Sequence, residues 1–225
     1  MMLGTLASFR WYFRGRGPAL WVIATWIAVP VLAVLTWDVY LEFPGVAGDT
    51  VLTARVSLPI LGILVSVWLL TPALPSLDAR GRPEIRVFGS VCILCVIAAA
   101  AASTALVVLW VTHAPSQFVP RDFVGDDDIR LLLWPLIDNV IVVGAAASLC
   151  FCAFGRSGGV LASVTVYVGL VMVGANPHWY QMVPYYSHGI GVPVTSHPVA
   201  AAALTFAGVL VWFRTSGSTM WTRET

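Results

Sequence analysis

The chain has 225 residues, of which 59% are hydrophobic and 10% are charged, and its mean hydropathy is +0.87. A soluble domain of ordinary composition carries about 25% charged residues, so this composition excludes a water-soluble globular protein. The net charge of +1 comes without a basic run that could follow a phosphate backbone, which excludes a typical nucleic-acid-binding surface.

All twelve basic residues are arginines, and the chain contains no lysine. A P-loop requires a lysine that reaches the β- and γ-phosphates of the nucleotide, so a standard nucleotide site is excluded. A lysine Schiff base to retinal or pyridoxal phosphate is excluded for the same reason. We therefore expect no cofactor in this chain.

Residues 2–16 predict an amphipathic helix lying in the membrane interface. At 100° per residue, Met2, Leu6, Phe9 and Phe13 fall within one narrow arc. The alternative is an ordinary charged leader preceding the first membrane span.

Six apolar runs follow, each close to the roughly 20 residues that a helix needs to cross the hydrocarbon core. They predict an all-α polytopic membrane protein with a single transmembrane domain over residues 1–225 and spans at about 19–41, 51–74, 87–112, 131–154, 159–175 and 197–213.

The arginines predict the orientation of these spans, because cytoplasmic loops are enriched in Arg and Lys. With the N-terminus inside, the external half of the protein receives Arg55, Arg121 and Arg130. The cytoplasm receives Arg10, Arg14, Arg16, Arg80, Arg82, Arg86, Arg156, Arg214 and Arg223. We therefore predict a multi-pass protein of the plasma membrane with both termini cytoplasmic.

The cytoplasmic loop between the second and third spans, residues 75–86, is short, charged and interrupted by Gly and Pro. It could present a rigid charged surface to a cytoplasmic partner, or it could serve as a positive-inside anchor. The residues that could carry a partner contact are Asp78, Arg80, Gly81, Arg82, Glu84 and Arg86.

This layout resembles the membrane subunit of ATP-binding cassette transporters of the type-2 exporter class. Members of that class have an interfacial helix, six spans, a short coupling loop between spans two and three, and an external re-entrant element between spans five and six. Many of their coupling loops read acidic-Arg-x-x-Gly-Thr-x-Glu. Here Gly81 and Glu84 keep that spacing with Asp78 upstream, whereas Arg82 replaces the usual Thr and Pro83 precedes the Glu.

The resemblance implies a permease subunit of an ATP-driven exporter, with no catalysis in this chain. A separate ATP-binding cassette ATPase, which carries ATP and Mg, would dock on residues 75–86. A second copy of the chain or a similar permease would complete a dimeric pathway through the lipid membrane. The substrate and the choice between homodimer and heterodimer stay open.

The segment of residues 176–196 between the last two spans is too long for a tight turn and unusually aromatic. Aromatic residues favour the headgroup region, and non-helical backbone within the membrane must be shielded by protein. The segment predicts a lid over the outer end of a pathway, or an interfacial belt. Its candidate pathway residues are Trp179, Tyr180, Tyr185 and Tyr186.

Charged side chains inside spans are costly and are candidates for function. Asp138, followed by Asn139, lies about two turns into the fourth span, and Arg55 lies about one turn into the second span. We expect an Arg55–Asp138 ion pair that either serves an external gate or fixes helix packing. An Asp138→Asn change that left both assembly and transport intact would contradict this pairing.

Two clusters raise the question of metal binding. Cys92, Cys95, Cys150 and Cys152 fall near the cytoplasmic face, where four thiolates could bind zinc. Side chains of Cys-x-Cys on a helix point about 200° apart, however, which disfavours a common site. The histidines His113, His178, His188 and His197 lie on the external side in no standard ligand spacing. We therefore predict no metal site.

Two other functional classes are weighed against the permease. Gly155-Arg156-Ser157-Gly158 matches the Gly-x-Ser-Gly of rhomboid proteases, which would make the chain an intramembrane serine protease. A catalytic serine needs its base within hydrogen-bonding reach, and every histidine is predicted about 30 Å away across the membrane. A non-transporting scaffold or regulatory subunit is the second alternative.

Overall fold

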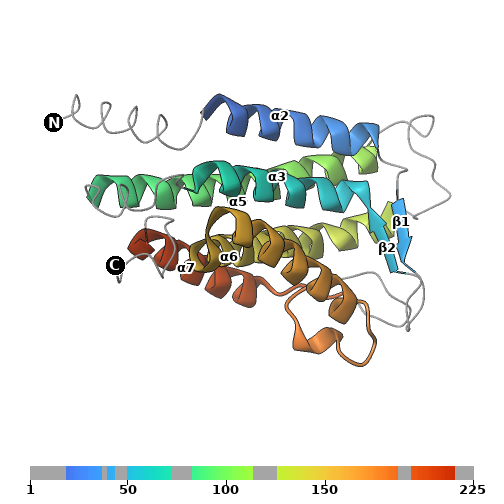
Figure 1. Cartoon of the computed structure of the whole chain (residues 1–225). Helices are drawn as coiled ribbons and strands as arrows, with labels where there is room; N and C mark the ends of the chain where they lie inside the picture. Colours follow the sequence, from blue (N-terminus) through green and yellow to red (C-terminus); the bar gives the residue numbers. More distant parts are fainter. Residues whose placement is uncertain are drawn as a thin grey trace.

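The computed structural model describes residues 19–36, 40–43, 50–71, 83–113, 126–186 and 194–215. The described residues are predominantly helical, as predicted. The helices pack side by side into a bundle with their axes roughly parallel (Figure 1). They are α2 (Ala19–Leu35), α3 (Ala54–Leu70), α5 (Pro83–His113), α6 (Asp126–Gly174) and α7 (Pro198–Thr215).

Three stretches within these helices are long and apolar enough to cross a bilayer: Arg86–His113, Leu133–Gly174 and Pro198–Thr215. The apolar stretches Trp21–Leu35 and Ser57–Leu70 are shorter. Many large apolar side chains point outward from the bundle, among them Trp21, Leu161 and Phe206. An apolar surface of this extent would cause aggregation in water, so the protein is membrane-embedded.

A short β-hairpin between α2 and α3 departs from the predicted all-helical fold. Strand β1 (Tyr40–Phe43) pairs antiparallel with β2 (Thr50–Thr53), with Tyr40 opposite Thr53 and Phe43 opposite Thr50. The predicted spans 19–41 and 51–74 were therefore wrong at their adjoining ends. Tyr and the β-branched Thr and Val favour a strand, and apolar content alone does not distinguish a strand from the end of a helix.

Helix α6 is two helices joined at Gly155, which has φ 71° and ψ −167°. This backbone region is essentially restricted to glycine. The first half, residues 126–154, and the second half, residues 156–174, pack against each other with opposite direction. Phe151 lies against Gly159, and Val143 shares a cluster with Val171. The break agrees with the predicted boundary between residues 154 and 159.

Two other helix starts differ from or refine the predictions. Helix α5 begins at Pro83 rather than at residue 87, so Glu84 and Arg86 belong to its first turn. Proline suits the first helical position because its missing amide proton would have no helical acceptor there. The same rule applies to α7, which begins at Pro198 as expected.

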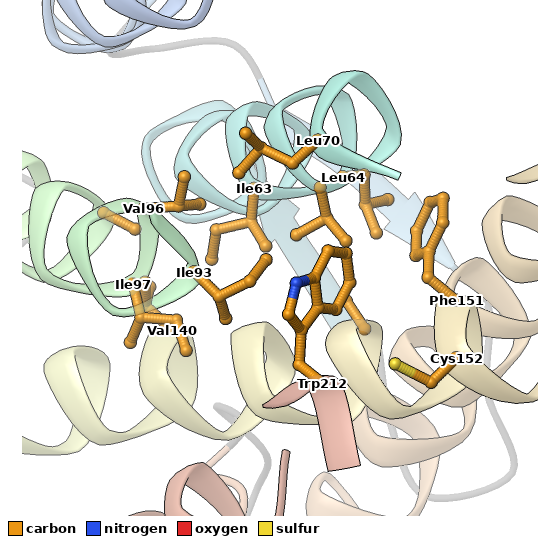
Figure 2. Close-up of a cluster of buried hydrophobic side chains, with 13 residues drawn as sticks. Ile63, Leu64, Leu70, Ile93, Val96, Ile97, Val140, Phe151, Cys152 and Trp212 are labelled. Atoms are coloured by element: carbon orange, nitrogen blue, oxygen red, sulfur yellow. The ribbon is translucent and has the colours of Figure 1, made fainter. Parts of the chain in front are cut away.

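The larger core cluster lies where α3, α5, α6 and α7 meet. Trp212 of α7, which is fully buried, projects between α3 and α6, with Ile63 and Ile93 on one side and Cys152 on the other (Figure 2). The helices α6 and α7 approach closely at Gly208, where an added Cβ would lie 2.5 Å from the Ser148 Oγ. Small residues at such a crossing permit the close backbone packing typical of membrane helices.

The bundle has two unlike ends. The arginine end comprises the end of α3, the start of α5, Gly155 and the end of α7, and carries Arg86, Arg156 and Arg214. The polar end comprises the opposite helix ends, the β-hairpin and the segment joining α6 to α7 (Figure 1). This segment, residues 175–197, is called the connecting segment; its described parts are residues 175–186 and 194–197.

Candidate functional site

At the polar end, two adjacent buried side chains of α6 hold both described parts of the connecting segment. Asn139 makes two bonds to the main chain of Tyr186: its Oδ1 accepts from the Tyr186 N–H at 2.8 Å, and its Nδ2 donates to the Tyr186 carbonyl. The Asp138 Oδ2 accepts from the His197 N–H at 2.8 Å. Asp138 is 7% exposed and Asn139 is 2% exposed. The two residues therefore fasten the segment at two points, 11 residues apart.

The helix explains how neighbours can reach separate points. Consecutive residues project about 100° apart, so Asp138 and Asn139 point toward different parts of the same segment. A buried polar side chain is costly unless its hydrogen-bonding groups find partners, and main-chain groups supply them here. Because backbone groups exist in any sequence, nothing in the sequence indicated that these were the partners.

The first part of the connecting segment forms a compact turn. The Asn176 Oδ1 accepts from the His178 N–H at 2.9 Å, and the single-turn helix η2 (Tyr180–Met182) follows. Trp179 and Met182 are exposed, at 54% and 75%. The segment therefore places an aromatic and an apolar side chain on the outside of the polar end, and the lid or interfacial role of the segment stays a prediction.

The two consecutive tyrosines point into the protein instead. Tyr185 is buried beside Ile60 of α3 and Val143 and Val171 of α6, while Tyr186 is held through its main chain by Asn139. Burial, and secondarily the neighbouring Tyr167, raise the pKa of Tyr185 well above its ordinary value. Its hydroxyl therefore stays protonated at physiological pH and remains a hydrogen-bond donor.

Tyr167 and Ser57 are the site residues that the sequence analysis missed. The Tyr167 ring meets the Tyr185 ring edge-on, with centroids 6.3 Å apart and an interplanar angle of 71°. The Tyr167 hydroxyl lies 3.4 Å from the Ser57 Oγ. A tyrosine in the middle of an apolar run was the available signal, because buried tyrosine hydroxyls usually have a partner.

The predicted Arg55–Asp138 ion pair cannot be followed at its Arg55 end, because the Arg55 side chain lies outside the described part of the structure. The backbone places Arg55 in the first turn of α3, at the polar end. The pair stays a prediction, and His197 is a partner of Asp138 that the prediction did not include.

At the arginine end, the Arg156 guanidinium carbon lies 3.8 Å from the centre of the Trp68 ring. Arg86 lies in the first turn of α5 and Arg214 in the last turn of α7. The predicted partner-binding residues Asp78, Arg80, Gly81 and Arg82 lie outside the described residues, as does the predicted interfacial helix of residues 2–16. The side chain of Glu84 is not described either.

The cysteine and histidine clusters can be placed in part. The four cysteines are free thiols, and no group of three or more potential metal ligands occurs within the described ranges. Cys152 accepts a hydrogen bond from Thr215 at 3.4 Å, which joins the ends of the first half of α6 and of α7. Ser157 follows the break at the arginine end, whereas His113 and His197 lie at the polar end, so these residues do not form a serine–histidine pair.

Comparisons with protein-family models, with curated proteins and with solved structures found no match for this chain.

Proposed function

We propose that this chain is the permease subunit of an ATP-driven exporter, with the arginine end cytoplasmic and the polar end external. Two such subunits form the pathway, and separate ATPase subunits bind at the loop between α3 and α5. The chain supplies no chemistry of its own. Alternating access, driven by closure of the partner ATPases, moves the substrate.

The observation that carries the proposal is the fastening of the connecting segment by Asp138 and Asn139. A loop between the last two helices needs no buried carboxylate and amide if it merely joins them. A segment that covers the external end of a pathway must instead be held in a defined position, and the two fastening points provide that. The exposed Trp179 and the buried Tyr185 fit a segment lying between the headgroup region and the bundle.

The distribution of charge supports the orientation. Arg86, Arg156 and Arg214 come from three different helices and share one end of the bundle. Enrichment of arginine on the cytoplasmic side sets the direction of insertion. The proposal accordingly counts α2, α3, α5, the two halves of α6, and α7 as six spans, which returns both termini to the cytoplasm.

Co-purification tests the proposal. The tagged chain is extracted from its native host in a mild detergent, and its partners are identified by mass spectrometry. We expect a stoichiometric ATP-binding cassette protein, lost when Gly81→Ala and Glu84→Gln are combined. The matched control combines Glu42→Gln in β1 with Gly45→Ala, and it should retain the partner.

The second candidate, a non-transporting scaffold or regulatory subunit, is favoured by one observation. Asp138 and Asn139 both bond to main chain within the same molecule, which is what a purely structural fastening would show. Purification of the chain alone, or with a partner that lacks nucleotide-binding motifs, would contradict the permease and support the scaffold.

A further inference from the structure

A relay of three side chains, Ser57, Tyr167 and Tyr185, joins α3 to the connecting segment through the second half of α6. Ser57 of α3 lies 3.4 Å from the Tyr167 hydroxyl. The Tyr167 ring in turn meets the Tyr185 ring edge to face, with the ring centroids 6.3 Å apart. The relay therefore crosses three separate elements, with Tyr167 at its centre.

Apolar packing surrounds the relay and ties its ends to the same elements. Ile60, one turn after Ser57 on α3, shares a buried cluster with Val171 of α6 and with Tyr185. Tyr185 is 3% exposed and is followed by Tyr186, whose main chain Asn139 holds. If α3 moves near Ser57 and Ile60, then either Tyr185 must move with it or the contacts of the relay must break.

Helix α3 reaches from the relay to the arginine end. Ser57 and Leu70 are separated by 13 residues, or about 20 Å of helix at 1.5 Å per residue. Leu70 packs in the other core cluster, with Phe151 and Trp212. The next residues along the chain are those of the loop on which the partner ATPase is proposed to dock.

We propose that Tyr167 is a positioning residue that couples α3 to the connecting segment, so that movement of α3 changes how firmly the segment closes the polar end. The coupling rests on the proposed function for its driving force, since the partner ATPase moves α3. The contact between Tyr167 and the connecting segment does not itself depend on a partner. Loss of the Tyr167 hydroxyl loosens the segment whether or not ATP is used.

The test measures labelling of a cysteine at position 182 by a membrane-impermeant maleimide, in sealed native membranes with the polar side outward. Met182 is 75% exposed, and the four native cysteines are replaced by alanine in the full-length chain carrying Met182→Cys. Tyr167→Phe keeps the ring and removes the hydroxyl. Thr165→Val is the matched control on the same half of α6, because it removes a hydroxyl that donates to the Leu161 carbonyl within its own helix.

Without nucleotide, Tyr167→Phe should change the rate of labelling at position 182 by about two- to tenfold, the population shift expected from one net hydrogen bond. Thr165→Val should leave the rate unchanged. Equal rates in the two variants would overturn the role of Tyr167, whatever the partner does.

With ATP and vanadate, the parent and Thr165→Val should show a nucleotide-dependent change in labelling. Tyr167→Phe should lack this change while it still binds the ATPase. A full response in Tyr167→Phe would overturn the coupling. Absence of any response in all three, together with absence of an ATPase, would overturn the permease. That result would also overturn the coupling to ATP. The nucleotide-free comparison would still show whether Tyr167 holds the connecting segment in place.

Discussion

The two ends of the bundle are stabilised by different kinds of interaction. At the arginine end, Trp212 is enclosed by apolar side chains from α3, α5 and α6, and no described residue lies within hydrogen-bonding reach of its indole nitrogen. At the polar end, Asp138 and Asn139 hold a non-helical segment through three main-chain hydrogen bonds. The apolar packing depends on side-chain volume and can accept another apolar residue of similar size. The polar contacts of Asp138 and Asn139 depend on the position of individual oxygen and nitrogen atoms.

The two ends of the bundle should therefore differ in how they move. Close-packed interiors resist deformation because every displacement opens voids or creates overlaps. A few directional bonds can be broken and re-formed as a unit, at a net free energy of about 1 kcal/mol each. We therefore expect the polar end to be the part that changes conformation and the arginine end to move as a rigid body.

The largest effect should follow Trp212→Ala, which leaves a cavity at the centre of the packed end. Such truncations cost about 3–5 kcal/mol in protein cores. We expect the loss of unfolding free energy to be near the lower limit. In the unfolded state the side chain contacts lipid instead of water, so only the packing contribution is lost. The measurement is the free energy of unfolding of the purified chain in mixed micelles.

The control is Trp21→Ala. Trp21 lies on α2 with 64% of its surface exposed, so its loss removes no buried contact and should change stability by less than about 0.5 kcal/mol. Equal losses in the two variants would mean that Trp212 is not the centre of a packed core.

Asn139→Leu should have the next largest effect, and it should be local to the polar end. The change removes both Asn139 hydrogen bonds to the Tyr186 main chain, and losing the partner of a buried polar group costs about 1–3 kcal/mol. Hydrogen exchange of the Tyr186 amide should accelerate, while amides around Trp212 keep their protection. Asn139→Asp retains an acceptor for the Tyr186 N–H and should have a smaller effect. Uniform loss of protection at both ends would remove the distinction drawn between them.

Gly159→Ala should destabilise the packed end by about 1–3 kcal/mol, the usual cost of overpacking. The added Cβ would lie 2.8 Å from the Phe151 Cα, so the two halves of α6 must separate. Gly169→Ala in the same helix meets nothing within 4 Å, and should be neutral or stabilising because alanine is the better helix former. Comparing the unfolding free energies of these two variants isolates the helix contact, and a stable Gly159→Ala would show that the halves are not packed as described.

Asp138→Asn separates the bond to His197 from the predicted pair with Arg55. The amide oxygen can still accept from the His197 N–H, so loss of charge alone should cost about 1 kcal/mol. Removing one partner of a buried ion pair costs about 3–5 kcal/mol and would damage assembly as much as transport. Unfolding and assembly measurements on Asp138→Asn, with Arg55→Gln in parallel, decide between these outcomes. A variant that leaves both assembly and transport intact contradicts the pair.

The sequence predicted the helices better than it predicted their ends. Apolar runs located the helical segments, and Gly155 with its neighbours located the break in α6, because these signals lie in the residues themselves. The β-hairpin was missed, since Val, Thr and Tyr next to an apolar run are compatible with either structure. Four residues of helix before position 87 were missed for the opposite reason, because charged residues and Pro83 resemble a loop.

Two residues of the candidate site were singled out in the sequence, and their role in a gate stays a prediction. Asp138 and Asn139 stand out because polar residues are rare within spans, and both prove to be buried and bonded. Tyr167 interrupts an apolar run, but neither it nor Ser57 carries a charge, and nothing in the sequence shows that the two residues meet. Their relation depends on the antiparallel packing of α3 and the second half of α6, across 110 positions of sequence.

The claim that the two ends face opposite sides of the membrane is tested most directly by labelling in intact cells. In the cysteine-free chain, Met182→Cys and Ser157→Cys place a single exposed thiol at the polar end and at the arginine end, respectively. We predict that an impermeant maleimide labels position 182 in intact cells and labels position 157 only after lysis. Labelling of both positions from outside, or of position 157 alone, would contradict the orientation and the external role of the connecting segment.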